Sequence, residues 1–384
     1  MRWPPVSQDS RSAEWACAIL FLLISEPETT RVIRKRVLCV CLLFGAALAA
    51  TGCSSQEDLS KCRSTDPDIK IAGCTALIQT GNVTTQDLST FYNNRGAAYF
   101  DKHDFDRAIQ DYNEAIRLNP KLATSFYGRG DSYDHKGDFD RAIQDQSEAI
   151  RLDPKFAYAY DARGRAHRNK GDFDQAIEDY SEAIRLNPNY ALALNNRGDS
   201  YRSKGDYTLA LRDFNDAIRL NPKLASAYNN RGFVHFMQLN LAAAIEEWDQ
   251  VIAFSPSSKA AVLAAMDLHI AMRRLGRDDV ERLSSVASAA DLLTWPGPVL
   301  RLDLGQMTAD QVVAAAAHAS AEQQKWQVCE ANYFTGEDAL IHHQRATAIS
   351  RLNAARDGCP KTEGSYAAAL AELRRLGEPA GGVK

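Results

Sequence analysis

The sequence has no marked excess of either charge and lacks the motifs of common enzymes and zinc sites. Its 45 basic and 49 acidic residues give a formal net charge of −4, and binding of a nucleic acid requires a basic face. There is no Cys-x-x-Cys pair, and no His-Glu-x-x-His, Gly-x-Ser-x-Gly or P-loop motif. We therefore expect no catalytic residue, no metal, no cofactor and no nucleic-acid partner.

The apolar run near the start of the chain is too short to cross a membrane. It covers residues 37–50, whereas a spanning helix needs about 20 apolar residues. Basic residues precede this run and small residues follow it, which predicts a secretory signal peptide. No methionine occurs between Met1 and Met237. We interpret residues 1–31 as a start-site artefact, with Val32 as the alternative start, and residues 32–52 as the signal peptide.

The middle of the chain repeats with a period of 34 residues. A glycine recurs at this spacing, an aromatic or leucine residue precedes it by four positions, and an alanine follows it by twelve. Apolar residues inside each unit recur every three or four positions, which indicates two amphipathic helices. The repeated Lys-Gly-Asp predicts the turn between them, and a proline closes each unit. The glycines are Gly96, Gly130, Gly164, Gly198 and Gly232.

This period and these residue types resemble the tetratricopeptide repeat. The resemblance implies an all-α, right-handed superhelical solenoid of stacked helical hairpins with a concave groove. We expect a tether and degenerate first repeat at 53–88, five repeats at 89–258 and a degenerate helical segment at 259–328 with a break at Trp-Pro-Gly-Pro. A sixth, repeat-like hairpin is expected at 329–362, a cap helix at 363–377 and a flexible tail at 378–384.

The residues before Cys53 resemble the lipobox of bacterial lipoproteins. Ala50, Thr51 and Gly52 directly precede this cysteine, and the resemblance implies cleavage before Cys53 and its lipidation. Plain cleavage after Ala49 is the alternative. The lipobox, the repeats and the C-terminal Cys-Glu-Ala-Asn-Tyr segment together resemble alphaproteobacterial tetratricopeptide lipoproteins related to new lipoprotein I. This implies a periplasmic protein with a lipid anchor in the outer membrane.

Four cysteines remain after the leader and Cys53 are set aside. Cys329 opens the last predicted hairpin and Cys359 closes it, so the hairpin brings them together. Cys62 and Cys74 are predicted to join the first hairpin in the same way. Disulfides at these positions require an oxidising compartment such as the periplasm. Buried, reduced thiols are the alternative for both pairs.

The predicted groove face consists of the residues three before, one after and four after each repeat glycine. We predict an acidic first half, a basic centre and an apolar far end, a surface that suits a peptide of mixed charge with an apolar anchor. The set of residues that forms a two-carboxylate clamp in chaperone-binding family members is absent. The candidate residues are Asn93, Tyr127, Asp131, Asp134, Asp161, Arg165, Arg168, Asn195, Asp199, Arg202, Asn229, Phe233 and Phe236.

An arginine precedes the glycine in every repeat. We interpret this column as structural ion pairs with a neighbouring acid, such as Asp106 or Asp111 for Arg95. The function expected from all these features is a non-enzymatic scaffold for envelope proteins. The resemblance implies peptidoglycan hydrolases or an envelope protease as partners. The alternative is a soluble periplasmic or secreted protein that carries a client, and the sequence leaves the oligomeric state open.

Overall fold

The computed structural model describes residues 56–81, 83–317, 321–360 and 364–378. The predicted leader, the candidate lipidation site Cys53 and the tail residues 379–384 lie outside them. The described residues are almost entirely helical. They form two units, of which the first ends at Thr84 and the second begins at Thr85. None of the described helices is long and apolar enough to cross a membrane.

The N-terminal unit is a short helical hairpin closed by a disulfide. One helix covers residues 56–62, and α3 covers Pro67–Thr80. The Asp66 side chain accepts a hydrogen bond from the Ile69 N–H at 3.0 Å, which caps the start of α3. Cys62 and Cys74 are joined in the structure, with their Cα atoms 4.5 Å apart.

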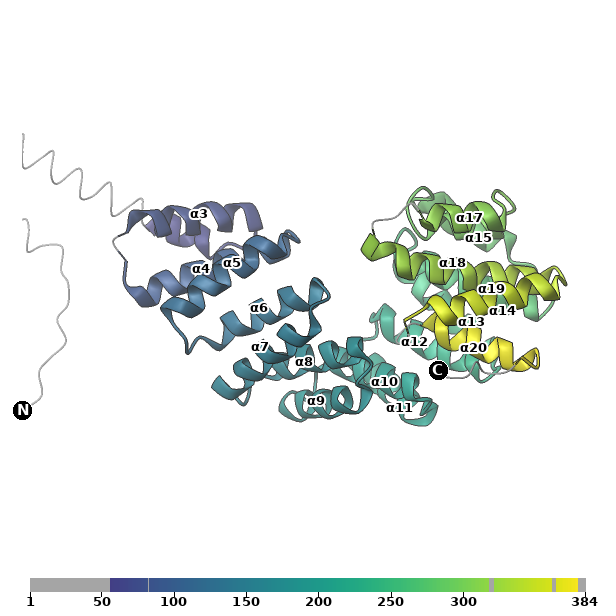
Figure 1. Ribbon diagram of the computed structural model, residues 1–384, viewed down its shortest axis with the longest axis horizontal. Coiled ribbons are helices and arrows are strands. Elements are labelled where there is room, and N and C mark those ends of the chain that lie inside the picture. The colour runs from purple at the N-terminus through teal and green to yellow at the C-terminus, as the bar shows by residue number, and fades with distance from the viewer. Residues whose placement is uncertain (1–55, 82, 318–320, 361–363, 379–384) are drawn as a thin grey trace, which may run out of the picture. The chain divides into compact units, whose positions relative to one another are not determined.

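Consecutive antiparallel hairpins make up the first part of the second unit (Figure 1). Each hairpin has one helix that carries the repeat glycine and a second, strongly amphipathic helix. The first helix begins at Thr85, ahead of the predicted boundary at residue 89. The pairs are α4 (Thr85–Asp101) with α5 (Phe105–Leu118), α6 (Ala123–His135) with α7 (Phe139–Leu152), α8 (Ala157–Lys170) with α9 (Phe173–Leu186), α10 (Ala191–Lys204) with α11 (Tyr207–Leu220), and α12 (Ala225–Met237) with α13 (Leu241–Phe254).

The repeat glycines let the two helices of a hairpin approach closely. At Gly164, an added Cβ would lie 2.9 Å from the Tyr180 ring, which is fully buried in the facing helix. The turn between the helices requires a left-handed residue, and glycine adopts this conformation at least cost. Gly171 has a φ of 89° in this turn, whereas His103, Leu239 and His343 hold the same conformation in other hairpins.

The arginine column forms ion pairs within each hairpin, as the sequence predicts. Arg163 Nη2 lies 2.6 Å from Asp179 Oδ1, and its Nε donates to the other oxygen at 2.9 Å. Asp179 is buried, so this two-point contact satisfies a carboxylate that water does not reach freely. In the first repeat Arg95 takes Asp111, while Asp106 pairs with Lys136 of the next repeat. The remaining pairs are Arg129–Asp145, Arg197–Asp213 and Arg231–Glu247.

Replacing Arg163 by alanine is expected to lower the free energy of unfolding by about 1–3 kcal/mol, because it leaves the buried Asp179 carboxylate unpaired. The matched control is Arg185→Ala, which removes an exposed pair with Glu182 and should cost about 0.5 kcal/mol or less. Urea unfolding of both variants measures the difference. Equal losses would contradict the structural role of the column.

The C-terminal part of the second unit is a less regular set of helices. Its helices are α14 (Lys259–Arg274), α15 (Val280–Ala289), α16 (Gly297–Asp303), α17 (Ala309–Ala317), α18 (Ala321–Ile341), α19 (Arg345–Gly358) and α20 (Gly364–Arg375). The Trp-Pro-Gly-Pro motif leads into α16: Trp295 and Pro296, joined by a cis bond, precede the helix, and Gly297 is its first residue. α18 and α19 form the last hairpin, with Cys329 joined to Cys359.

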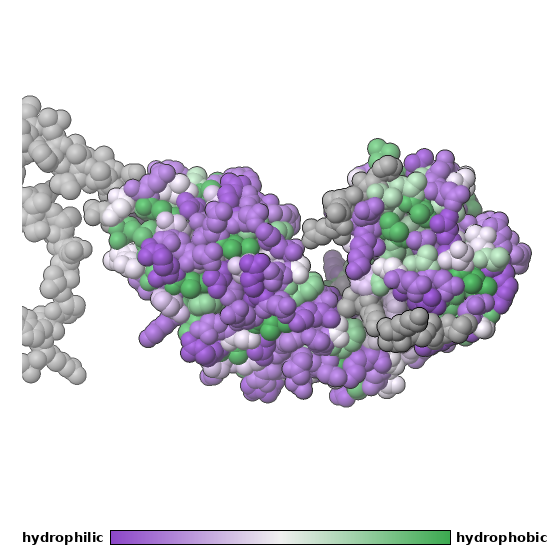
Figure 2. Space-filling view, viewed as in Figure 1, coloured by the Kyte–Doolittle hydropathy of each residue, from purple (hydrophilic) through white to green (hydrophobic). Residues whose placement is uncertain are grey.

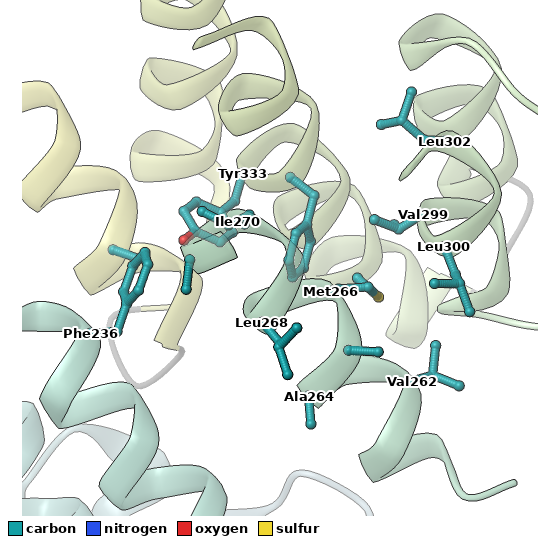
Figure 3. Close-up of a cluster of buried hydrophobic side chains, with 14 of the residues drawn as sticks. Phe236, Val262, Ala264, Met266, Leu268, Ile270, Val299, Leu300, Leu302 and Tyr333 are labelled. Carbon is teal, nitrogen blue, oxygen red and sulfur yellow. The ribbon is translucent and has the colours of Figure 1, made fainter. Parts of the chain in front are cut away.

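A continuous apolar core holds these helices together and reaches the last repeat. Met266 and Leu268 of α14 are fully buried with Leu300 of α16 and Tyr333 of α18 (Figure 3). Phe236 of α12 belongs to the same core. α20 packs on α18 and α19 and also contacts α12. The C-terminal helices therefore lie against the end of the repeat array.

Candidate functional site

The predicted groove residues lie on the first helix of each hairpin, which we call the inner helix. Most of them contact the neighbouring hairpin. Arg165 of α8 donates from Nε to Asp134 of α6 at 2.7 Å and also pairs with Asp131. Asn169 donates to the other oxygen of Asp134 at 3.1 Å. Asp134 is buried under these partners. These contacts tie α8 to α6.

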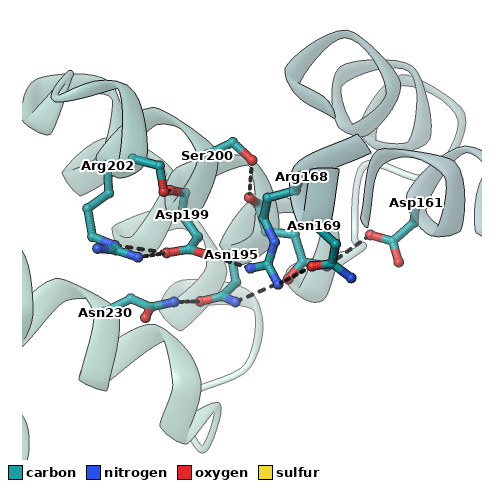
Figure 4. A network of polar contacts seen from close by, with 10 residues as sticks. Asp161, Arg168, Asn169, Asn195, Asp199, Ser200, Arg202 and Asn230 are labelled. Carbon is teal, nitrogen blue, oxygen red and sulfur yellow. Dashed lines mark hydrogen bonds and ion pairs between the residues drawn. The ribbon is translucent and has the colours of Figure 1, made fainter. Parts of the chain in front are cut away.

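Asp199 of α10 is the centre of a second group of contacts (Figure 4). Arg168 of α8 lies 2.5 Å from one of its oxygens, and Arg202 of α10 lies 2.6 Å from the other. Burial opposes ionisation of this carboxyl, but the two guanidinium groups outweigh it and hold the pKa of Asp199 below its ordinary value. Asp199 is therefore a charged, fully paired carboxylate between two repeats.

Amide side chains continue the same pattern between the repeats. Asn196 of α10 donates to Asp161 of α8 at 3.1 Å, and the Tyr190 hydroxyl donates to the same carboxyl at 3.3 Å. Burial raises the pKa of Asp161, and these donors act against the rise. Asn230 of α12 donates to Asn195 of α10 at 3.1 Å. Polar bonds therefore join the successive groove helices from α6 to α12.

This pairing corrects the predicted division of the groove into an acidic half and a basic centre. Asp131 and Asp134 neutralise Arg165, and Asp199 neutralises charge on Arg168 and Arg202. The acids and bases lie side by side because residues about one repeat apart in the chain are neighbours in the stack. In the view of Figure 2, the surface over α4 to α11 is mostly hydrophilic, with its polar groove residues bonded to each other.

The prediction that Phe236 lies on the groove surface is wrong, because this residue belongs to the core. Its side chain is only 6% exposed, with its ring 5.8 Å from Trp248 and under the Arg274 guanidinium at 4.7 Å. The C-terminal helices supply this cover, which the repeat pattern alone does not include. Of the other predicted groove residues, Asn93 accepts a hydrogen bond from Ser125.

Aromatic side chains remain accessible on the inner helices. Tyr127 packs on Phe156 with ring centroids 5.1 Å apart, and Phe156 contacts Tyr158. Tyr158 is 51% exposed and lies 5.2 Å from the Tyr190 ring. These rings form a row beside the polar contacts and offer apolar area to a binding partner.

A cavity of about 290 Å³ lies where the repeats meet the C-terminal helices. We call it the groove-end pocket. Its repeat wall contains five predicted groove residues: Arg168, Asp199, Arg202, Asn229 and Phe233. Its opposite wall comes from α14, α18 and the start of α20. Asn169 and Asn230 complete the repeat wall, and Leu263, Asp267, Glu330, Tyr333, Phe334, Gly364 and Ser365 form the opposite wall.

The repeat pattern of the sequence does not predict the C-terminal wall of this pocket. One residue of this wall could have been predicted, because Tyr333 lies three residues before Gly336 of the last hairpin, a position that belongs to the groove face in the repeats. Glu337 lies one residue after that glycine, which is also a groove position, but it is buried in an ion pair with Arg274 at 2.7 Å. Asp267 and Glu330 follow no repeat position, so only the packing of α14 and α18 reveals them.

No group of histidine, cysteine, aspartate and glutamate suited to a metal ion occurs within residues 56–81, 83–317, 321–360 and 364–378. His342 and His343 are both exposed at the turn between α18 and α19. His343 holds the left-handed turn position with a φ of 60°. The two histidines therefore lie in the turn between these helices.

Solved structures of several repeat proteins resemble parts of this chain. MamA matches at 26% identity with a TM-score of 0.38, covering 41% of this chain and 93% of its own. YrrB, described as a tetratricopeptide repeat protein with an unusual peptide-binding site, matches at 23% identity and a TM-score of 0.39, covering 50% and 97%. PilF of Pseudomonas aeruginosa matches at 16% identity and a TM-score of 0.46, covering 58% and 98%. No curated protein sequence matches the chain.

Sequence profiles of one family match most of the hairpin array. Profiles described as Tetratricopeptide repeat match residues 89–122, 123–156, 162–225 and 196–259. These ranges coincide with the hairpins from α4 to α13, whose glycine, aromatic and alanine columns produce the close helix packing described above. The hairpins of this all-α solenoid between residues 89 and 259 are therefore tetratricopeptide repeats.

Proposed function

We propose that this chain is a non-enzymatic interaction protein that binds a segment of a partner protein along the inner helices of its repeats. The groove-end pocket carries the proposal, because it combines a cavity of about 290 Å³ with the aromatic residues Phe233, Tyr333 and Phe334. Concave sites are where proteins usually bind ligands, and the polar side chains that line this one can fix the orientation of a bound group. The Tyr158 and Tyr190 rings, 5.2 Å apart, offer further apolar area outside the pocket.

Photo-crosslinking at single positions tests this proposal. A photoreactive phenylalanine analogue at Phe233 or Tyr158 is expected to form adducts with the partner in cells. The matched control is the same analogue at Arg185, whose side chain is 66% exposed on the second helix of its hairpin, outside the pocket lining. Adducts that are equal at all three positions would contradict binding at the inner helices.

We further propose that Cys53 carries a lipid that anchors the protein in the outer membrane, facing the periplasm. The lipobox-like residues before Cys53 support this, and so do the paired cysteines, since disulfides persist in oxidising compartments. Peptidoglycan hydrolases or an envelope protease are the partners that the lipoprotein resemblance suggests. The intact mass of the mature protein from the membrane fraction tests the anchor. An unmodified N-terminus at Ala50 would instead favour the soluble periplasmic or secreted carrier.

A further inference from the structure

The repeat wall of the groove-end pocket has its positive charges already engaged. Arg168 and Arg202 both contact Asp199, at 2.5 and 2.6 Å. The Arg202 guanidinium also lies over the Phe233 ring, 5.0 Å from its centroid. Each of these two cations therefore has a carboxylate partner on its own wall.

On the C-terminal wall, Asp267 is an acid without such a partner. Within the described residues, no hydrogen bond or ion pair reaches the carboxylate of Asp267 on α14. Burial raises the pKa of Asp267 to about 8, and the nearby acids Glu330, Glu337 and Asp303 contribute to the rise. Glu330 lines the pocket beside Asp267 and accepts a hydrogen bond from Trp295 Nε1 at 2.7 Å.

The other charged groups near Asp267 do not pair with its carboxylate. Glu337 of α18 is paired with Arg274, which also contacts Glu372 of α20 at 2.8 Å. Asp303 of α16 contributes to the raised pKa of Asp267 and does not line the pocket. A half-buried carboxylate without a partner is less favourable when ionised than one in water, and an incoming cation would relieve that cost.

Aromatic rings complete an environment that suits a cation on an apolar stem. Phe233 lies on one wall, and Tyr333 and Phe334 lie on the other with their ring centroids 5.0 Å apart. Ring faces attract ammonium and guanidinium groups, and rings also pack against the methylene stems of lysine and arginine. A cavity of about 290 Å³ suits one side chain better than a folded segment.

We propose that the groove-end pocket binds a lysine or arginine side chain of the partner, with its cation facing Asp267 and Glu330. This proposal rests on the proposed function, since it selects the residue that anchors a bound segment. An acidic side chain would meet two carboxylates in this pocket. An apolar side chain would cover the half-buried Asp267 without giving it a partner.

Short capped peptides test the proposal on the full-length mature protein. Acetylated and amidated pentapeptides with lysine, arginine, norleucine or glutamate at the centre are compared by fluorescence anisotropy. We expect lysine and arginine peptides to bind about tenfold more tightly than the norleucine peptide at pH 9. The preference should shrink at pH 6.5, because protonation of Asp267, with its pKa of about 8, removes the charge that selects the cation.

Asp267→Asn is expected to abolish the preference for a basic residue, because it removes the carboxylate that selects the cation. Asp303→Asn is the matched control, because burial also raises the pKa of Asp303, to about 7, but this residue does not line the pocket. The control should keep the preference. If Asp267→Asn fails to fold, the pH dependence of the wild-type protein decides the question.

Two kinds of result would overturn the proposal. Equal selection of basic peptides by the wild type and Asp267→Asn, or tighter binding of the glutamate or norleucine peptide, would overturn the cation pocket alone. Crosslinks at Phe233 would then still support binding of a partner at this place. Failure of every peptide together with absence of crosslinks at Phe233 would overturn both the pocket and the proposed function.

Discussion

Replacing Arg274 by methionine is expected to lower the free energy of unfolding by about 3–5 kcal/mol, the usual cost of removing one partner from a buried ion pair. Arg274 lies 2.7 Å from Glu337 and 2.8 Å from Glu372, and Glu337 is only 2% exposed. Methionine keeps much of the volume over the Phe236 ring but leaves Glu337 without its cation, whereas Glu372 keeps its contact with Arg375 at 3.0 Å. Urea unfolding measures the loss.

The loss from Arg274→Met should depend on pH. Burial raises the pKa of Glu337 above its ordinary value, and Arg274 acts against that rise. Without the guanidinium the folded-state pKa rises further, so the folded protein holds the proton more tightly than the unfolded chain. The variant therefore loses additional stability as the pH rises from about 4.5 through this higher pKa. We expect a smaller difference from the wild type at pH 5 than at pH 8.

Arg273→Met provides the control, because Arg273 is the exposed neighbour on the same helix. It should change stability by about 0.5 kcal/mol or less. Equal effects of the two substitutions, or a loss from Arg274→Met that does not change between pH 5 and pH 8, would contradict the buried network. Because Arg274 links α14 to α18 and α20, we also expect its loss to weaken the C-terminal wall of the groove-end pocket.

Replacing both Cys329 and Cys359 by serine is expected to cost about 3–4 kcal/mol in the oxidised protein, the chain-entropy value for a loop of this length. The two residues are 30 positions apart and join the ends of the hairpin formed by α18 and α19. Hydrogen exchange of this hairpin measures the local effect. A reducing agent should produce the same change in the wild type and no further change in the variant.

The other disulfide gives a matched control within the same molecule. The disulfide between Cys62 and Cys74 joins residues 12 positions apart in the N-terminal unit. Replacing both by serine therefore leaves the disulfide of the C-terminal helices in place. Exchange should accelerate around α3 and stay unchanged in α18 and α19. Free thiols at Cys329 and Cys359 in unreduced native protein would contradict both the disulfide and the oxidising compartment inferred from it.

The repeat array could be predicted from the sequence because its contacts are local and periodic. The Arg163–Asp179 pair joins residues 16 positions apart within one hairpin, so the columns of the repeat already contain both partners. Close packing at Gly164 follows from the same columns. The amphipathic pattern of 3.6 residues per turn and the glycine turns then determine each hairpin with little help from the rest of the chain.

Only the tertiary structure determined how the charges of the groove residues are paired and where the groove-end pocket lies. Arg165 and Asp131 are one repeat apart, so whether their charges face a partner or each other depends on the stacking of neighbouring hairpins. The contact between Arg274 and Glu372 spans 98 positions and follows no repeat. Phe236 is buried and Asp267 reaches the pocket because α14, α18 and α20 pack against the last repeats. A periodic pattern specifies neighbours within and between repeats, whereas contacts with helices outside the period arise only from the packing of the folded chain.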